Sequence, residues 1–206
     1  SPDGTWAVYQ KMDGDFWQIF KTSLATGEEI KLTNSIADNT NPAVSPDGNW
    51  IVYERVDERG YRQIYRTSLD GGEEVPLTFE ACDHESPRIS QDGNWIAYVK
   101  WLPESSGVSN SQICYIPATG GDVTPITDTS GIEENPSWSP DCQLIVYEKT
   151  SSGDKSNGHR GIGIAPTNLT SQRPSQNIRK LPLSFALAQN HPHPFAGLTK
   201  ISFALP

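Results

Sequence analysis

A four-residue turn phrase recurs four times along this 206-residue chain, and no other feature limits its fold as strongly. The phrase is a Ser-Pro-Asp-Gly type of turn followed by an apolar run, as in "SPDGNWIVYE". The copies begin at Ser1, Ser45, Ser90 and Ser139, with spacings of 44, 45 and 49 residues. Self-similarity at such a period indicates a repeat architecture in which each copy is one supersecondary unit.

The turn residues have a clear physical role. Pro46 presets the backbone for the second position of a type I turn, and Asp47 can bond the backbone downstream of it. Gly48 accepts the left-handed conformation of a three-residue hairpin loop. The fourth copy carries Cys142 in place of this glycine, which costs about 1 to 2 kcal/mol if the left-handed geometry is kept. We therefore expect the fourth turn to be distorted or looser.

Three further segments recur in the same order around each turn. "NPAVS", "SPRIS" or "NPSWS" precedes it, and "FWQIFKTSL", "YRQIYRTSL" or "SQICYIPAT" follows after a loop. A last segment opens with Gly and closes on Thr33, Thr78 or Thr127. The "WIVY" run is continuously apolar, which predicts a strand buried on both faces. Together these patterns predict an all-β chain, a β-propeller of four-stranded blades.

The "SPDGxWIVY" phrase, the "NPxxS" before it and the "GGEEVPLT" ending resemble the repeats of TolB-like propellers over residues 1–149. This resemblance implies the fold directly and the function only broadly. Similar repeats occur in TolB, a periplasmic partner-binding protein, in the propeller domains of prolyl-oligopeptidase-type peptidases and in some sugar-acting lyases. The resemblance also implies a periplasmic or extracellular location.

We predict a single propeller domain over residues 1–206. Its units are 1–33, which lacks an inner strand, then 34–78, 79–127, 128–184 and a degenerate fifth unit at 185–206. Residues 161–169 and 177–184 are the expected third and fourth strands of the fourth unit.

Residues 191–204 align without gaps on 41–54, which leaves two architectures open. Residues 191–195 could supply the missing inner strand and close four blades. Alternatively they begin a fifth unit, and the molecule is an open arc of about four and a half blades from a larger ring. We favour the arc because the sequence begins and ends in mid-repeat. Its open blade edges predict self-association.

The net charge of -9 conceals an asymmetry. All 25 acidic residues lie at or before Asp154, whereas six of the 16 Lys and Arg lie in residues 155–206. The field of the acidic body repels phosphates, so we expect no nucleic-acid partner. No run approaches the ~20 apolar residues that cross a bilayer, so the chain is not expected to span a membrane. No GxSxG, HExxH, GxGxxG or P-loop motif occurs, and we assign no catalytic residue and no cofactor.

Polar residues gather just before each expected inner strand. In a propeller these connections lie on one face around the central channel, so repetition alone would bring their carboxylates together. The candidate partner-binding residues are Asp38, Asn39, Asn41, Asp83, His84, Glu85, Glu133, Glu134 and Asn135.

Three interpretations of this polar cluster are open. Its Asp and Asn residues could satisfy backbone groups in the loop, while Pro42, Pro87 and Pro136 start the strands. The cluster could be an acidic face that receives a basic peptide or protein. Asp83, His84 and Glu85 could also bind a metal. Consecutive residues of an extended backbone point in opposite directions, so these three could not all bind one ion, and we assign no metal site.

Our working hypothesis is a non-catalytic propeller scaffold that binds a protein or peptide partner through its acidic inner-strand face. The alternative is the propeller portion of an enzyme, either a prolyl-oligopeptidase-type peptidase or a sugar-acting lyase.

Overall fold

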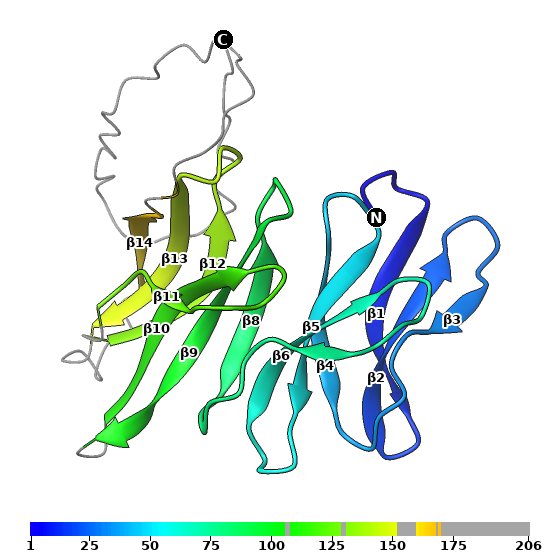
Figure 1. Ribbon diagram of the computed structural model, residues 1–206, viewed down its shortest axis with the longest axis horizontal. Helices are drawn as coiled ribbons and strands as arrows, with labels where there is room; N and C mark the ends of the chain where they lie inside the picture. Colours follow the sequence, from blue (N-terminus) through cyan, green and yellow to red (C-terminus); the bar gives the residue numbers. More distant parts are fainter. Residues whose placement is uncertain (106–107, 129–130, 152–159, 168, 170–206) are drawn as a thin grey trace, which may run out of the picture. The chain divides into compact units, whose positions relative to one another are not determined.

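The computed structural model describes residues 1–105, 108–128, 131–151, 160–167 and 169 (Figure 1). The chain divides into two units, Ser1–Ser171 and Gln172–Pro206, and the second lies outside the described residues. The strand expected at 177–184 and the fifth unit expected at 185–206 lie there too. The boundaries of the repeat units therefore stay predictions. No helix in the described part of the chain is long and apolar enough to cross a membrane.

The described residues form four antiparallel sheets, in which strands that follow each other in sequence pair with each other (Figure 1). The first sheet contains β1 (Trp6–Asp13), β2 (Phe16–Ser23) and β3 (Glu29–Lys31). The second contains β4 (Asn39–Val44), β5 (Trp50–Val56), β6 (Arg62–Ser68) and β7 (Val75–Pro76). The third contains β8 (His84–Ile89), β9 (Trp95–Ser105), β10 (Val108–Pro117) and β11 (Thr124–Pro125). The fourth contains β12 (Gly131–Trp138), β13 (Leu144–Ser151) and β14 (Arg160–Pro166).

This architecture confirms the prediction of an all-β chain built from propeller blades. The innermost strands β4, β8 and β12 each contact the strands of the preceding sheet, so successive sheets pack face to face. Among the described residues, no strand of the first sheet pairs with a strand of the fourth, and the sheets do not close.

The hairpin between β4 and β5 has the predicted turn geometry. Gly48 has a φ of 71°, and its N–H donates to the Ser45 carbonyl at 2.9 Å. The Ser45 hydroxyl donates to the Asp47 carboxylate at 2.5 Å and accepts the Trp50 N–H at 3.1 Å. The bond from Ser45 holds the pKa of Asp47 below its ordinary value. These bonds set the register between the two strands.

The fourth turn keeps the same geometry, so the expected distortion was wrong. Cys142 adopts a φ of 58°, and its N–H donates to the Ser139 carbonyl at 2.9 Å. The Ser139 hydroxyl donates to Asp141 at 2.6 Å, as Ser45 does to Asp47. Cys142 is also buried, with 7% of its surface exposed. The turn's own hydrogen bonds and this burial hold a left-handed cysteine in place of glycine.

The apolar run after the turn is buried on both faces in the second sheet, as predicted. Ile51 and Tyr53 pack in the cluster shared with the first sheet, and Trp50 and Val52 pack in the cluster shared with the third. The alternation of a strand thus sends one half of the run into each core.

Candidate functional site

Most of the polar cluster lies within the inner strands, because these begin earlier than predicted, and only Asp38 and Asp83 lie just before a strand. Asn39 opens β4 and His84 opens β8. The prolines lie inside a bulge instead of starting the strand, with register shifts between Thr40 and Ala43 and at the equivalent points of β8 and β12. The residue before each proline is left-handed, namely Asn41 (φ 50°), Ser86 (φ 54°) and Asn135 (φ 53°).

The bulges of β4 and β8 each present a backbone N–H to the sheet before them. The Asn41 N–H donates to Gln10 Oε1 at 2.9 Å, and the Ser86 N–H donates to Glu54 Oε1 at 2.7 Å. Glu54 also accepts a bond from the Asn41 side chain at 2.8 Å. Because Glu54 is only 2% exposed, loss of solvation raises its pKa. Sequence analysis missed Gln10 and Glu54, although both are the first polar residue after the apolar run.

The two aspartates of the cluster serve the backbone of the preceding sheet. Asp38 accepts the N–H of Trp17 at 2.9 Å, and Asp83 accepts the N–H of Arg62 at 2.8 Å. This geometry favours the backbone-binding interpretation for both residues.

Three members of the cluster are enclosed and cannot reach a partner. Asn39, His84 and Glu133 are at most 1% exposed. Asn39 donates to the Ser35 hydroxyl at 2.7 Å, and Glu133 forms an ion pair with Lys149 at 3.4 Å. These three side chains therefore lie in the interior of the sheets and not on a binding face.

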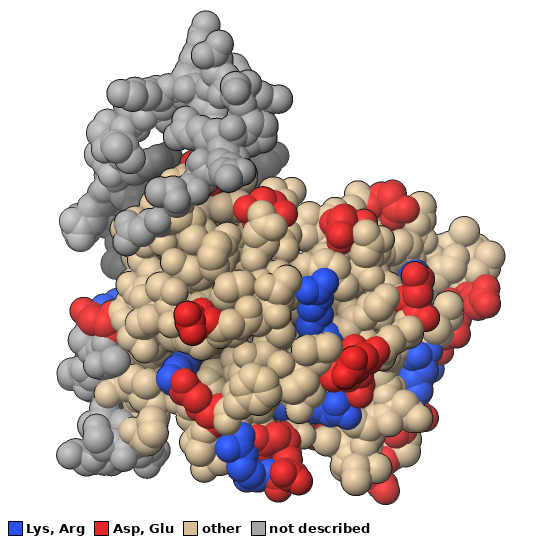
Figure 2. Space-filling view, viewed as in Figure 1, with Lys and Arg blue, Asp and Glu red and all other residues tan. Residues whose placement is uncertain are grey.

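The remaining carboxylates are partly exposed and already paired. Glu85 accepts bonds from Arg62 and from the Trp101 indole, both at 2.8 Å. Glu134 lies 3.8 Å from Arg160. Figure 2 shows acidic and basic groups side by side on the visible face. Asn41 and Asn135 are the members that are exposed to solvent.

An open cleft of about 1070 Å³ lies at the Asp38 end of the first two sheets. Ile36 and Phe79 line it with 90% and 65% of their surfaces exposed. Arg59 stiffens one wall, because its guanidinium donates to the Phe79 carbonyl at 3.0 Å and pairs with Asp57 at 2.6 Å. Sequence analysis missed this cleft, since isolated apolar residues in polar loops carry no periodic signal.

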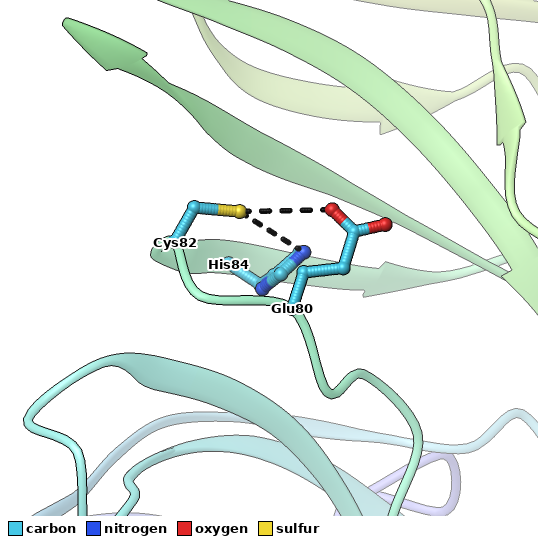
Figure 3. Close-up of side chains that lie close together, drawn as sticks. All are labelled: Glu80, Cys82 and His84. Atoms are coloured by element: carbon cyan, nitrogen blue, oxygen red, sulfur yellow. Dashed lines mark hydrogen bonds between the residues drawn. The ribbon is translucent and has the colours of Figure 1, made fainter.

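Glu80, Cys82 and His84 alternate along the chain, and their side chains meet on one side of it (Figure 3). Cys82 Sγ lies 3.7 Å from Glu80 Oε2 and 3.8 Å from His84 Nε2. Burial lowers the pKa of His84 to about 4 and raises the pKa of Cys82 to about 11. Asp83 and Glu85 bond elsewhere, to the Arg62 N–H and the Trp101 indole.

Successive antiparallel sheets of up to four strands that pack face to face are the blades that characterise the class of β-propellers. The model of the TolB beta propeller domain matches residues 1–158, and the chain belongs to that family. The comparison with curated proteins found no match.

Solved structures are similar to this chain over part of their length. TolB from Acinetobacter baumannii is 25% identical with a TM-score of 0.57, over 82% of this chain and 42% of that one. A putative TolB from Agrobacterium tumefaciens is 26% identical with a TM-score of 0.55, over 61% and 46%. A puromycin-hydrolyzing peptidase from Mycobacterium tuberculosis, 14% identical with a TM-score of 0.59 over 81% and 28%, shares the fold alone. The chain spans less than half the length of each of these structures.

Proposed function

We propose that this chain is a non-catalytic propeller scaffold that binds a protein or peptide partner at the end of the sheets where the inner strands begin. One observation carries the proposal: Ile36 and Phe79 are exposed in an open cleft beside Asp38. Apolar side chains surrounded by charge are typical of protein-binding surfaces. The likeness to TolB structures supports the same proposal, and a periplasmic or extracellular location forms part of it.

The charges around the cleft favour a partner with basic groups beside an apolar side chain. Glu58 lines the cleft, is exposed, and forms no ion pair with another described residue. Arg59, in contrast, is already paired with Asp57. The unpaired charge at the cleft is therefore the negative charge of Glu58, in keeping with the acidic face predicted from the sequence.

Peptide selection tests this proposal. The immobilised protein selects binders from a random peptide library, and their affinities are then measured for the wild type and the double variant Ile36→Ser, Phe79→Ser. We expect an apolar residue flanked by Lys or Arg in the selected peptides. Loss of the two exposed anchors should weaken binding by about tenfold or more.

Ile162→Ser is the matched control, because Ile162 is also exposed, at 77%, but lies on β14 away from the cleft. It should leave the affinities unchanged. Peptides that bind the double variant as tightly as the wild type would refute the cleft as the binding surface.

The enzyme alternative stays a prediction, because the likenesses to peptidase and lyase structures concern the fold alone. Incubation with ester, peptide and uronate substrates, with and without divalent metal, tests it directly.

A further inference from the structure

Two equivalent loops of the repeat share one supporting scaffold. In the first, Gln18 donates to the carbonyls of Ser35 and Ala37 at 2.9 and 3.3 Å, and Thr33 donates to Gln18 at 2.9 Å. These bonds hold the connection from β3 to β4 from its inner side. All three bonds recur in the next unit.

In the second loop, Gln63 donates to the carbonyls of Glu80 and Cys82 at 2.8 and 3.3 Å. Thr78 donates to Gln63 at 2.8 Å. The positions of Ser35, Ala37 and Asn39 are thus taken by Glu80, Cys82 and His84. A serine, an alanine and an asparagine are replaced by a carboxylate, a thiol and an imidazole.

The polar side chain at the end of each loop behaves differently. Asn39 bonds to Ser35, to the Ala37 carbonyl and to Gln18, so it closes its own loop. His84 is 1% exposed, yet its Nδ1 has no hydrogen-bond partner among the described residues. The second loop is therefore held by Gln63 and Thr78, and the imidazole does not close it but turns Nε2 toward Cys82 Sγ.

We infer that Glu80, Cys82 and His84 form a zinc site. Their candidate ligand atoms all lie within 4.8 Å of one another. Zinc bound tetrahedrally to sulfur and nitrogen sets these two atoms about 3.5 Å apart. The observed 3.8 Å from Cys82 Sγ to His84 Nε2 needs a contraction of only a few tenths of an ångström. One thiolate, one imidazole and one carboxylate form a donor set that suits this borderline-soft ion and leaves a fourth position for water.

The surroundings of the cluster are compatible with an ion. Zinc binding displaces the thiol proton of Cys82 to water, and neutral His84 offers a nitrogen lone pair. Glu80 Oε2 faces Cys82 Sγ and also pairs with Lys100, so the carboxylate has to rotate to offer its second oxygen to the ion while it keeps the lysine. The Glu80 side chain is half exposed, so the ion can enter from that side.

Metal binding to the untagged protein, first stripped with a chelator, tests the inference with zinc and cobalt alone. We expect one zinc per chain by elemental analysis after dialysis, and a thiolate-to-cobalt charge-transfer absorption band with Co²⁺. Cys82→Ala and His84→Asn copy the first loop, in which these positions are Ala37 and Asn39. Each should weaken zinc binding about tenfold or more, and Cys82→Ala should abolish the cobalt band.

Cys142→Gly is the control, because it removes a second buried cysteine far along the sequence and should leave both measurements unchanged. Glu80→Ser, on the exposed side of the cluster, is a ligand variant that does not disturb the core. Either failure of the wild-type chain to bind zinc stoichiometrically or an unchanged cobalt band in Cys82→Ala would overturn the inference. Neither outcome bears on partner binding at the cleft, because these tests contain no peptide.

Discussion

Residue 142 shows how a fold can hold a residue in a conformation that the residue itself disfavours. Its φ of 58° is close to the 71° of Gly48 and the 74° of Gly93 in the equivalent turns. A cysteine there pays for the clash of its Cβ with the backbone, and glycine does not. The hydrogen bonds of Ser139 and Asp141 outweigh that cost.

We expect Cys142→Gly to stabilise the protein by about 0.5 to 1 kcal/mol, since relief of the left-handed strain exceeds the loss of a small buried side chain. Gly93→Cys is the reverse exchange and should destabilise by about 1 to 2 kcal/mol. A Cβ at Gly93 would meet only Pro46 Cδ, at 3.8 Å, so the cost there is conformational. Urea denaturation measures both free energies of unfolding. If both variants changed the free energy of unfolding in the same direction, this explanation would be contradicted.

At the scale of single strands, the threonine that closes each repeat completes the hydrogen bonds of its sheet. The hydroxyls of Thr33, Thr78 and Thr127 each accept a bond of 2.9 Å from a buried backbone N–H of β2, β6 or β10. The recurrence of threonine in the sequence thus has a structural cause. The outer strands are very short, and this side-chain bond extends their pairing.

Thr78→Val should destabilise the protein by about 1 to 3 kcal/mol, because it leaves the buried N–H of Ile64 without an acceptor. Thr67→Val is the matched control. Thr67 is 2% exposed, and its hydroxyl has no hydrogen-bond partner among the described residues. Its replacement should change the free energy of unfolding by less than about 0.5 kcal/mol. A large loss in the control, or none in Thr78→Val, would show that the hydroxyl bond is not the cause.

At the scale of the whole molecule, apolar contacts hold adjacent sheets together, and a few hydrogen bonds between the sheets align them. Gln10 and Glu54 occupy the same position of the repeat, and each accepts the N–H of the left-handed residue in the next inner strand. In the third sheet this position is Val99, whose side chain packs in the apolar cluster shared with the fourth. The repeat thus tolerates either a hydrogen-bond acceptor or an apolar side chain at this position between two sheets.

Glu54 makes the stability of this packing depend on pH. Burial raises its folded-state pKa above the ordinary value of 4.5. Its stabilising contribution is therefore complete below pH 4.5 and is lost as the pH rises through the folded-state pKa. Glu54→Gln does not titrate and still offers an oxygen to the Ser86 N–H. We expect the unfolding free energy of the variant, relative to wild type, to increase from pH 4.5 upward in urea denaturation. A relative stability that does not change with pH would contradict the raised pKa.

Local patterns were sufficient for the propeller fold and for the hairpin register. The "SPDG" phrase encodes its turn within four residues, and the "WIVY" run encodes a strand between two cores, because both signals depend on nearest neighbours in the sequence. The bulge was not predicted, although an Asn or Ser before each proline was visible, because its left-handed residue is held by acceptors in another sheet. Asp38 and Asp83 precede their strands as predicted, whereas the other cluster residues lie inside the strands.

The sequence therefore determines the turns and strands of each repeat, whereas the packing of the sheets determines which polar residues are exposed to solvent. Neighbouring sheets bury Asn39, His84 and Glu133 and leave Ile36 and Phe79 open, which reverses the expectation from polarity. Only His84 of the Glu80, Cys82 and His84 cluster lies in a strand, so its convergence with the other two depends on the loop that Gln63 holds. Cys82 and His84 are buried while Glu80 stays half exposed, and this difference comes from tertiary packing, such as that of Tyr98 against the His84 ring, which no local pattern specifies.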